Sequence, residues 1–193
     1  LIRINKNRVR SFHGRDEALD WGKYFSHYFN LLACAELASL TNWLQEQSGK
    51  QISSEAIQAI AIDLGILDFS GASAPDLNVA IKNQISKLQL KVNNPNSSLE
   101  IVLSMAESPI RMFADALEAS GLSDGRTIFC CIDEYENLLD YQQAILNTYI
   151  KHAAPPLSYK IGVRKNGLRN RQTLDGQDLL KTPDDYYEIE IAD

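Results

Sequence analysis

The chain has 193 residues, a formal net charge of −6 and a pI near 5.1. Its apolar fraction of 45% is that of an ordinary globular domain. The excess of negative charge disfavours general coating of nucleic acid or anionic membranes, although a local basic patch remains compatible with it. The sequence contains no apolar run of roughly 18 residues that could span a bilayer. We therefore expect no membrane partner. The three cysteines, Cys34, Cys130 and Cys131, fit reduced thiols, so we expect a cytoplasmic protein.

The N-terminal part of the chain is mainly helical by pattern. The opening "LIRIN" alternates apolar and polar residues like a half-covered strand, and the following "KNRVRSFHGRD" is expected to be a loop. Its basic residues, Arg8, Arg10, His13 and Arg15, could contact a partner or nucleic acid, or simply be solvated. Apolar spacing predicts helices over about 16–47, 53–64, 75–90 and 108–121, and a short strand over 99–103.

From residue 122 strands and helices alternate. We expect a strand over 127–132, a helix over 141–152 that starts with a capping box of Asp140 and Gln143, a strand from 157, and a final strand in "YYEIEI". Strand–helix–strand order predicts parallel strands with crossover helices. The fold class is therefore α/β, as one domain over 1–193 with a helical insertion at about 50–120. Because both ends look strand-like, we expect this to be a segment of a longer protein.

The stretch "TIFCCIDEYENLLDYQQ" contains the most informative motif. A continuous apolar strand, Ile128 to Ile132, ends in Asp133 and Glu134. In an open α/β sheet, ligands bind beyond the carboxyl ends of the strands. In nucleotide hydrolysis the first such acid holds Mg²⁺ or its water, and the second can accept a proton from the attacking water.

Two other interpretations of the acidic pair stay open. Apolar strands often end in an acidic turn, in which case the chain could be a non-catalytic α/β scaffold whose helical insertion docks a partner. A nuclease-like metal site is a further alternative, but it needs another carboxylate and a lysine that no recognisable spacing supplies.

The sequence also resembles a known family. "IFCCIDEYENLLDYQQAILNTYIKH" followed by "LSYKIGVRKNGLR" is similar to the Walker B and sensor-1 region of P-loop ATPases of the AAA+ superfamily, in particular bacterial proteins of the origin-recognition-like type. The resemblance is specific over about 126–172, weaker over 1–40 and absent over 50–105. It implies an ATP-hydrolysing domain with Asp133 as the Mg²⁺-associated acid, Glu134 as the catalytic base, and Arg164 near the sensor-1 position. It also implies homo-oligomers or a partner effector protein, with DNA as a further partner.

The basic loop after the last predicted strand fits this interpretation. Four cations occur within eight residues of an acidic chain: Arg164, Lys165, Arg169 and Arg171. They could contact a phosphate, act as an arginine finger, or touch DNA phosphates, and the plainer alternative is a solvated loop. We favour Arg164 and Arg169 as catalytic residues that stabilise charge.

The sequence departs from the family pattern at one essential point. A P-loop requires GxxxxGK[ST], and no such motif occurs in the 193 residues. The stretch "QSGKQ" fails because Gln51 follows Lys50 and Leu44 stands where the first glycine is needed. We therefore expect the phosphate-binding loop to lie upstream, and the 193 residues alone to be inactive.

Overall fold

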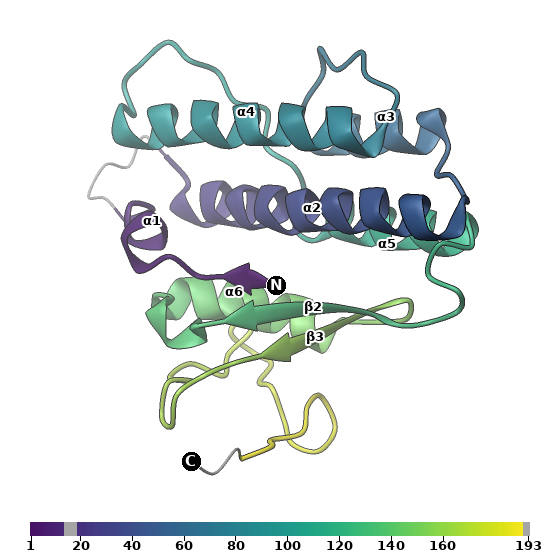
Figure 1. The fold of residues 1–193 in the computed structure, drawn as a ribbon. Helices are drawn as coiled ribbons and strands as arrows, with labels where there is room; N and C mark the ends of the chain where they lie inside the picture. Colours follow the sequence, from purple (N-terminus) through teal and green to yellow (C-terminus); the bar gives the residue numbers. More distant parts are fainter. Residues whose placement is uncertain (14–18, 191–193) are drawn as a thin grey trace.

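The computed structural model describes residues 1–13 and 19–190, and it consists of a three-stranded parallel sheet with helices packed against it (Figure 1). The predicted α/β class with a parallel sheet is confirmed. The elements, in chain order, are β1 (Ile2–Arg3), α1 (Lys6–Arg10), α2 (Trp21–Ser48), α3 (Ser54–Asp63), α4 (Ala74–Asn93), α5 (Ser108–Ala119), β2 (Ile128–Asp133), the 3-10 turn η1 (Tyr135–Asn137), α6 (Asp140–Lys151) and β3 (Leu157–Ile161).

The strands lie in the order β1-β2-β3 and all run in the same direction. In the register of the sheet, Ile132 of β2 lies between Ile2 of β1 and Ile161 of β3. The carboxyl ends of the three strands therefore meet at one edge. The segments that leave this edge are α1, the acidic pair Asp133–Glu134, and the basic loop that follows β3.

One face of the sheet is covered by helices and the other is open. Crossovers between parallel strands are nearly always right-handed, so strands added in one direction have their connecting helices on one face. Figure 1 shows α6 behind β2 and β3, with the front of both strands clear. On that front face the Phe129 side chain is 47% exposed, and the Lys160 ammonium lies 4.0 Å from its ring centroid.

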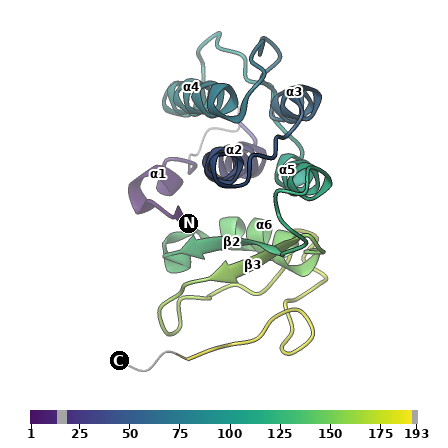
Figure 2. The same ribbon diagram turned by 45° about the vertical axis from the view of Figure 1, so that its right-hand side comes forward.

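The helical part forms two layers above the sheet. Figure 2 shows α3 and α4 outermost and α2 with α5 beneath them. Helix α2 begins where the Asp20 carboxylate accepts a hydrogen bond from Lys23 N (3.1 Å), and it ends at Gly49, whose φ of +71° is the usual left-handed stop. Fully buried Ile57, Leu77 and Phe113 fill the interior between the helices. None of the described helices is long and apolar enough to cross a membrane.

The basic segment after β1 is not a loop as predicted. Residues Lys6–Arg10 form the short helix α1, because Asn5 Oδ1 accepts hydrogen bonds from the N–H groups of Asn7 and Arg8, each at 3.1 Å. The buried Val9 side chain ties this turn to the core. Arg15 lies outside the described residues, as do positions 16–18 of the predicted long helix, which begins at Trp21.

Three further expectations are wrong in detail. Residues 99–103 form no strand, and neither do residues 186–190, because no neighbouring strand in the described chain pairs with them. The start of α6 is stabilised one residue away from the predicted capping box, since Gln142 Oε1 accepts from Leu139 N (2.9 Å). Gln143 is instead buried, and its side chain bonds to the basic loop that follows β3.

Candidate functional site

The acidic pair lies where β2 ends and the chain turns away from the sheet. Asp133 Oδ1 accepts a hydrogen bond from Glu134 N at 2.9 Å. Glu134 has φ +59° and ψ +40°, the left-handed region, which lets the chain enter η1 at once. A non-glycine residue pays about 1 kcal/mol or more for this conformation. Such strain, when kept, is an indicator of function.

Asn137 fixes the Glu134 carboxylate against the neighbouring strand. Its Nδ2 donates to Glu134 Oε2 at 2.7 Å and to the carbonyl oxygen of Ile4 at 3.3 Å. Ile4 directly follows β1, so one amide connects the ends of two strands. The carboxylate of Glu134 is therefore oriented, although the residue is exposed.

Gly162 leaves room beside Asp133. It directly follows β3, and its N–H donates to the carbonyl oxygen of Ile132 at 2.7 Å. A Cβ atom at position 162 would lie 2.9 Å from Asp133 Oδ1, closer than real contacts allow. Only glycine at this position therefore leaves the Asp133 carboxylate in its place.

The two favoured arginines lie at the same edge but in different surroundings. The Arg164 side chain is 89% exposed, and its Nε lies 3.2 Å from Glu136 Oε1, a bond that solvent weakens. Arg169 donates from Nη1 to the Glu136 carbonyl (2.8 Å), from Nη2 to the Leu138 carbonyl, and from Nε to Asp140 Oδ1 (3.3 Å). Arg169 therefore holds the η1 turn, whereas Arg164 is available to a ligand.

A buried glutamine of α6 anchors the basic loop. Gln143 Oε1 accepts from Arg169 N (3.1 Å) and Asn170 N (3.0 Å), and its Nε2 donates to the Gly167 carbonyl (3.1 Å). Its side chain is fully buried. Buried hydrogen bonds of this kind fix the backbone they bind, because breaking one leaves an unpaired polar group.

One helical turn further on, Asn147 continues the anchor. Its Nδ2 donates to the carbonyl oxygens of Asn170 (2.8 Å) and Gln172 (2.9 Å). Its Oδ1 accepts from the Tyr135 hydroxyl at 2.9 Å. Burial raises the pKa of Tyr135 far above its ordinary value, so this phenol stays a proton donor. Asn147 thus connects η1, α6 and the basic loop.

Helix α6 also anchors the segment after β1. Gln142 Nε2 donates to the Val9 carbonyl at 2.8 Å, and the Tyr141 hydroxyl donates to the Phe12 carbonyl. The exposed basic side chains of Lys6, Arg8 and Arg10 are therefore held at the same edge of the sheet as the acidic pair. Helix α6 is the element that fixes this segment there.

Several residues with a role in this geometry were not predicted from sequence: Asn137, Gln142, Gln143, Asn147 and Gly162. A signal for three of them was present. The run "YQQAILN" places amides at helical spacing among apolar residues, which indicates a helix that buries polar side chains against irregular backbone. No sequence signal distinguishes Gly162 from an ordinary loop glycine.

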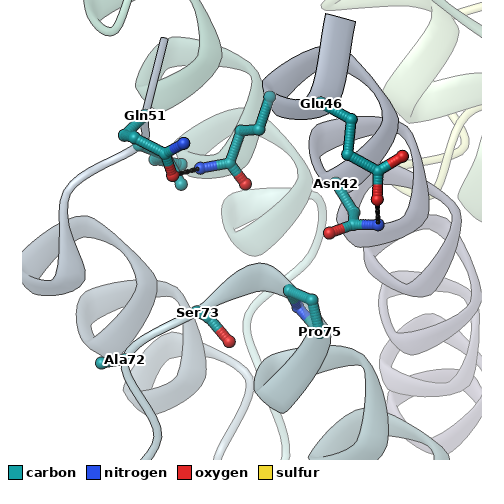
Figure 3. Close-up of a pocket in the computed structure, with 8 residues that line it drawn as sticks. Asn42, Glu46, Gln51, Ala72, Ser73 and Pro75 are labelled. Carbon is teal, nitrogen blue, oxygen red and sulfur yellow. Dashed lines mark hydrogen bonds between the residues drawn. The ribbon is translucent and has the colours of Figure 1, made fainter. Parts of the chain in front are cut away.

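Neither the pocket between α2 and α4 nor a cluster of metal ligands offers a second site in the described residues. A polar pocket of about 280 Å³ lies between the end of α2 and the start of α4 (Figure 3). Its polar side chains bond to each other: Asn42 Nδ2 donates to Glu46 Oε1 at 2.8 Å, and Gln45 Nε2 donates to Gln51 Oε1. The pocket therefore presents no convergent free groups. Within residues 1–13 and 19–190, no three His, Cys, Asp or Glu side chains are grouped to hold a metal. The nuclease-like alternative therefore gains no support.

One of three comparisons with known proteins gave a match, and it is compatible with the α/β fold. A family model described as ORC-CDC6-like matches residues 1–193, the whole chain, and this match places the chain among AAA+-related proteins. The chain belongs to the ORC-CDC6-like family. ATPases of this family generally bind ATP and Mg²⁺, and family members commonly oligomerise and engage DNA. Neither the comparison with curated proteins nor that with solved structures gave a match.

Proposed function

We propose that this chain supplies the water-activating half of an ATP site in an AAA+-type ATPase. The observation that carries the proposal is the placement of Asp133 and Glu134 at the carboxyl end of the central strand, with Gly162 and the basic loop beside them. Family membership supports an ATPase-related role, and the site itself supports the particular residues.

The residues present fit a magnesium ion carried in by a nucleotide. Mg²⁺ in such sites keeps most of its ligands from water and phosphate and takes one or two protein carboxylates. The Asp133 carboxylate lies beside Gly162, where a side chain at position 162 would displace it. Bound ATP with Mg²⁺ would supply the γ-phosphate and neutralise its charge. Asp133 would hold the metal or one of its waters.

In the proposed mechanism Glu134 is the general base. Its carboxylate accepts the proton of the water that attacks the γ-phosphate, and Asn137 holds Oε2 so that the carboxylate keeps its orientation. Arg164, which is exposed and only loosely paired with Glu136, contributes positive charge where negative charge develops. We propose Arg169 as a positioning residue, because its guanidinium is already bonded to η1 and α6.

The phosphate-binding half would be supplied by a P-loop from outside these 193 residues. The open face of the sheet carries Phe129, and Asp133 follows on the same face by strand alternation. Parallel sheets are normally covered on both faces. Among the described strands, β3 pairs on one side only. A strand and helix carrying the P-loop would cover this face and extend this edge.

The experiment is ATP turnover by the protein encoded by the complete gene. We expect Asp133→Asn to lower turnover by about 100-fold, since it removes the charged metal-associated oxygen. The matched control Asp115→Asn, on the exposed face of α5, should match the unmodified protein. The 193-residue chain alone should show no turnover. Clear turnover by this chain alone would refute the proposal that the P-loop comes from outside these 193 residues. Full activity of Asp133→Asn would refute the assignment of Asp133 to the ATP site.

We propose DNA phosphates as a second ligand class, contacted by α1. Lys6 and Arg10 are exposed and make no ion pair with any residue from the described ranges. We expect the double variant Lys6→Glu, Arg10→Glu to weaken binding of duplex DNA by the complete protein and to lower its salt dependence. The matched variant Lys82→Glu, Lys87→Glu on α4 should leave both unchanged. Equal loss in both variants would refute α1 as the contact.

A further inference from the structure

A shallow apolar groove lies far from the acidic pair, between α3, α5 and the segment 99–105. Its volume is about 420 Å³, and both methionines of the chain line it. Ile62 of α3 is 61% exposed and Met105 is 77% exposed. Large apolar side chains that share an exposed groove are typical of an interaction site rather than of a free surface.

The segment 99–105 forms one wall of the groove and runs without a bend or turn. One side of its backbone faces the protein. The carbonyl oxygen of Val102 lies against Gly65, where an added Cβ would come within 2.3 Å. The N–H of Ser104 donates to His27 Nδ1 at 3.1 Å.

The other side of this backbone has no hydrogen-bond partner among residues 1–13 and 19–190. In a straight segment the N–H and C=O groups of alternate residues point in opposite directions, so those of Ile101 and Leu103 point away from Gly65 and His27. Neither residue makes a backbone hydrogen bond with the part of the chain that the structure describes. Such a row of free groups is a template for another strand.

The charge around the groove identifies the chemistry of a partner. Residues 51–73 and 99–119, which contain α3, the segment and α5, carry seven carboxylates and a single arginine. That arginine, Arg111, is bonded to the Ala154 carbonyl (2.6 Å) and paired with Glu107. Glu100 on the segment and Glu55 on α3 are both exposed. The segments that form the groove therefore carry an excess of negative charge, and Asp63 lies among the residues that line it.

We propose that this groove binds an extended segment of a partner protein in which apolar residues alternate with lysine or arginine. The partner strand pairs with Ile101 and Leu103, its apolar side chains contact Ile62 and Met105, and its cations face Glu55 and Glu100. Pairing of two copies through the same groove is disfavoured on charge, since it would bring carboxylates against carboxylates. The proposal is independent of the ATP site.

The test uses a fluorescent synthetic heptapeptide in which lysine and valine alternate. We expect it to bind the protein and to slow hydrogen exchange of the Ile101 and Leu103 amides. The same peptide with its central valine replaced by proline should bind at least about tenfold more weakly, since it loses a backbone donor. Ile62→Ser and Met105→Ser should each weaken binding by about tenfold.

Matched variants separate the groove from general attraction to an acidic protein. Leu90→Ser on α4 removes an equally exposed apolar side chain and should bind the peptide normally. Glu100→Lys should weaken binding more than Glu46→Lys, which lies on α2. Absence of binding, equal binding of the proline peptide, or equal effects of the groove and control variants would each overturn the proposal. So would self-association of the protein that Met105→Ser abolishes.

Discussion

Two irregular segments of this protein, 164–173 and 99–105, differ in how many of their backbone N–H and C=O groups are hydrogen-bonded. The first receives buried hydrogen bonds from Gln143 and Asn147 of α6. The second is held only near its end, by His27 and Asn30, and its Ile101 and Leu103 have no backbone partner among the described residues. The first segment lies beside the acidic pair Asp133–Glu134 and is rigidly held. The second lies beside the apolar groove and keeps backbone groups free.

The contrast shows what each site requires. Catalysis needs groups held to within a fraction of an ångström, so buried amides that anchor the basic loop fit its proposed role of presenting Arg164 to a phosphate. A docking groove needs free backbone groups and adaptable side chains such as methionine. We call the anchored segment 164–173, with the end of the sheet beside it, the fixed edge. We call the segment 99–105, with its unpaired backbone groups, the open edge.

The strongest test of the fixed edge is Asn147→Ala. The substitution removes the side-chain donor of the Asn170 and Gln172 carbonyls and leaves the Tyr135 hydroxyl with the Gln143 carbonyl alone, so the free energy of unfolding should fall by about 4 kcal/mol. Denaturant unfolding measures it. Asn42→Ala, which removes a surface bond to Glu46, should cost less than about 0.5 kcal/mol. Equal losses would contradict the special anchoring of the basic loop.

The His27 anchor of the open edge should appear as a pH dependence. Burial lowers the pKa of His27 from 6.5 to about 4, so the folded protein keeps it neutral while the unfolded chain binds the proton. Its contribution is fully present above pH 6.5 and is lost as pH falls towards 4, by about 3 kcal/mol. Unfolding free energies measured between pH 7 and pH 4.5 should show this slope. A slope unchanged in His27→Gln would contradict the assignment.

At the fixed edge, Gly162→Ala should have a moderate effect on stability. The new Cβ meets Asp133 Oδ1, so we expect a loss of about 1–2 kcal/mol together with displacement of the carboxylate. The matched change Gly22→Ala in α2 meets no atom closer than 3.4 Å and should be neutral or stabilising by about 0.5 kcal/mol. If calorimetry finds both variants alike, Gly162 has no special role beside Asp133.

The smallest effects belong to the open edge. Met105→Ser and Ile62→Ser remove exposed side chains, so each should change the free energy of unfolding by less than about 0.5 kcal/mol, although we expect both to weaken peptide binding. A stability loss above about 2 kcal/mol in either variant would show that the groove belongs to the core. The open edge would then contribute to stability in the same way as the fixed edge.

The sequence predicted the elements whose pattern is local. Alternation of strands and helices after residue 122 predicted the parallel sheet, and the apolar run before Asp133 and Glu134 predicted the strand that ends at this pair. That this pair forms an ATP site stays a prediction. The helix α1 was missed because its stability comes from the Asn5 side chain and the buried Val9 rather than from periodicity. Five residues are too few to show a repeat.

Tertiary contacts explain the remaining differences. Ile101–Leu103 has the composition of a strand, but a strand forms only where a partner strand is available, and composition cannot show that. Arg164 and Arg169 look equivalent in the sequence. Only the structure shows that the Arg169 guanidinium is bonded to η1 and Asp140, whereas the Arg164 side chain is 89% exposed.

The central claim is that Glu134 is the base of an ATP site, and Glu134→Gln tests it most directly. In the protein encoded by the complete gene, we expect this variant to bind ATP as tightly as the unmodified protein but to hydrolyse it at least about 100-fold more slowly, because the amide cannot accept the proton. The matched variant Glu118→Gln on α5 should hydrolyse ATP normally. Turnover by Glu134→Gln equal to that of the unmodified protein would contradict the account.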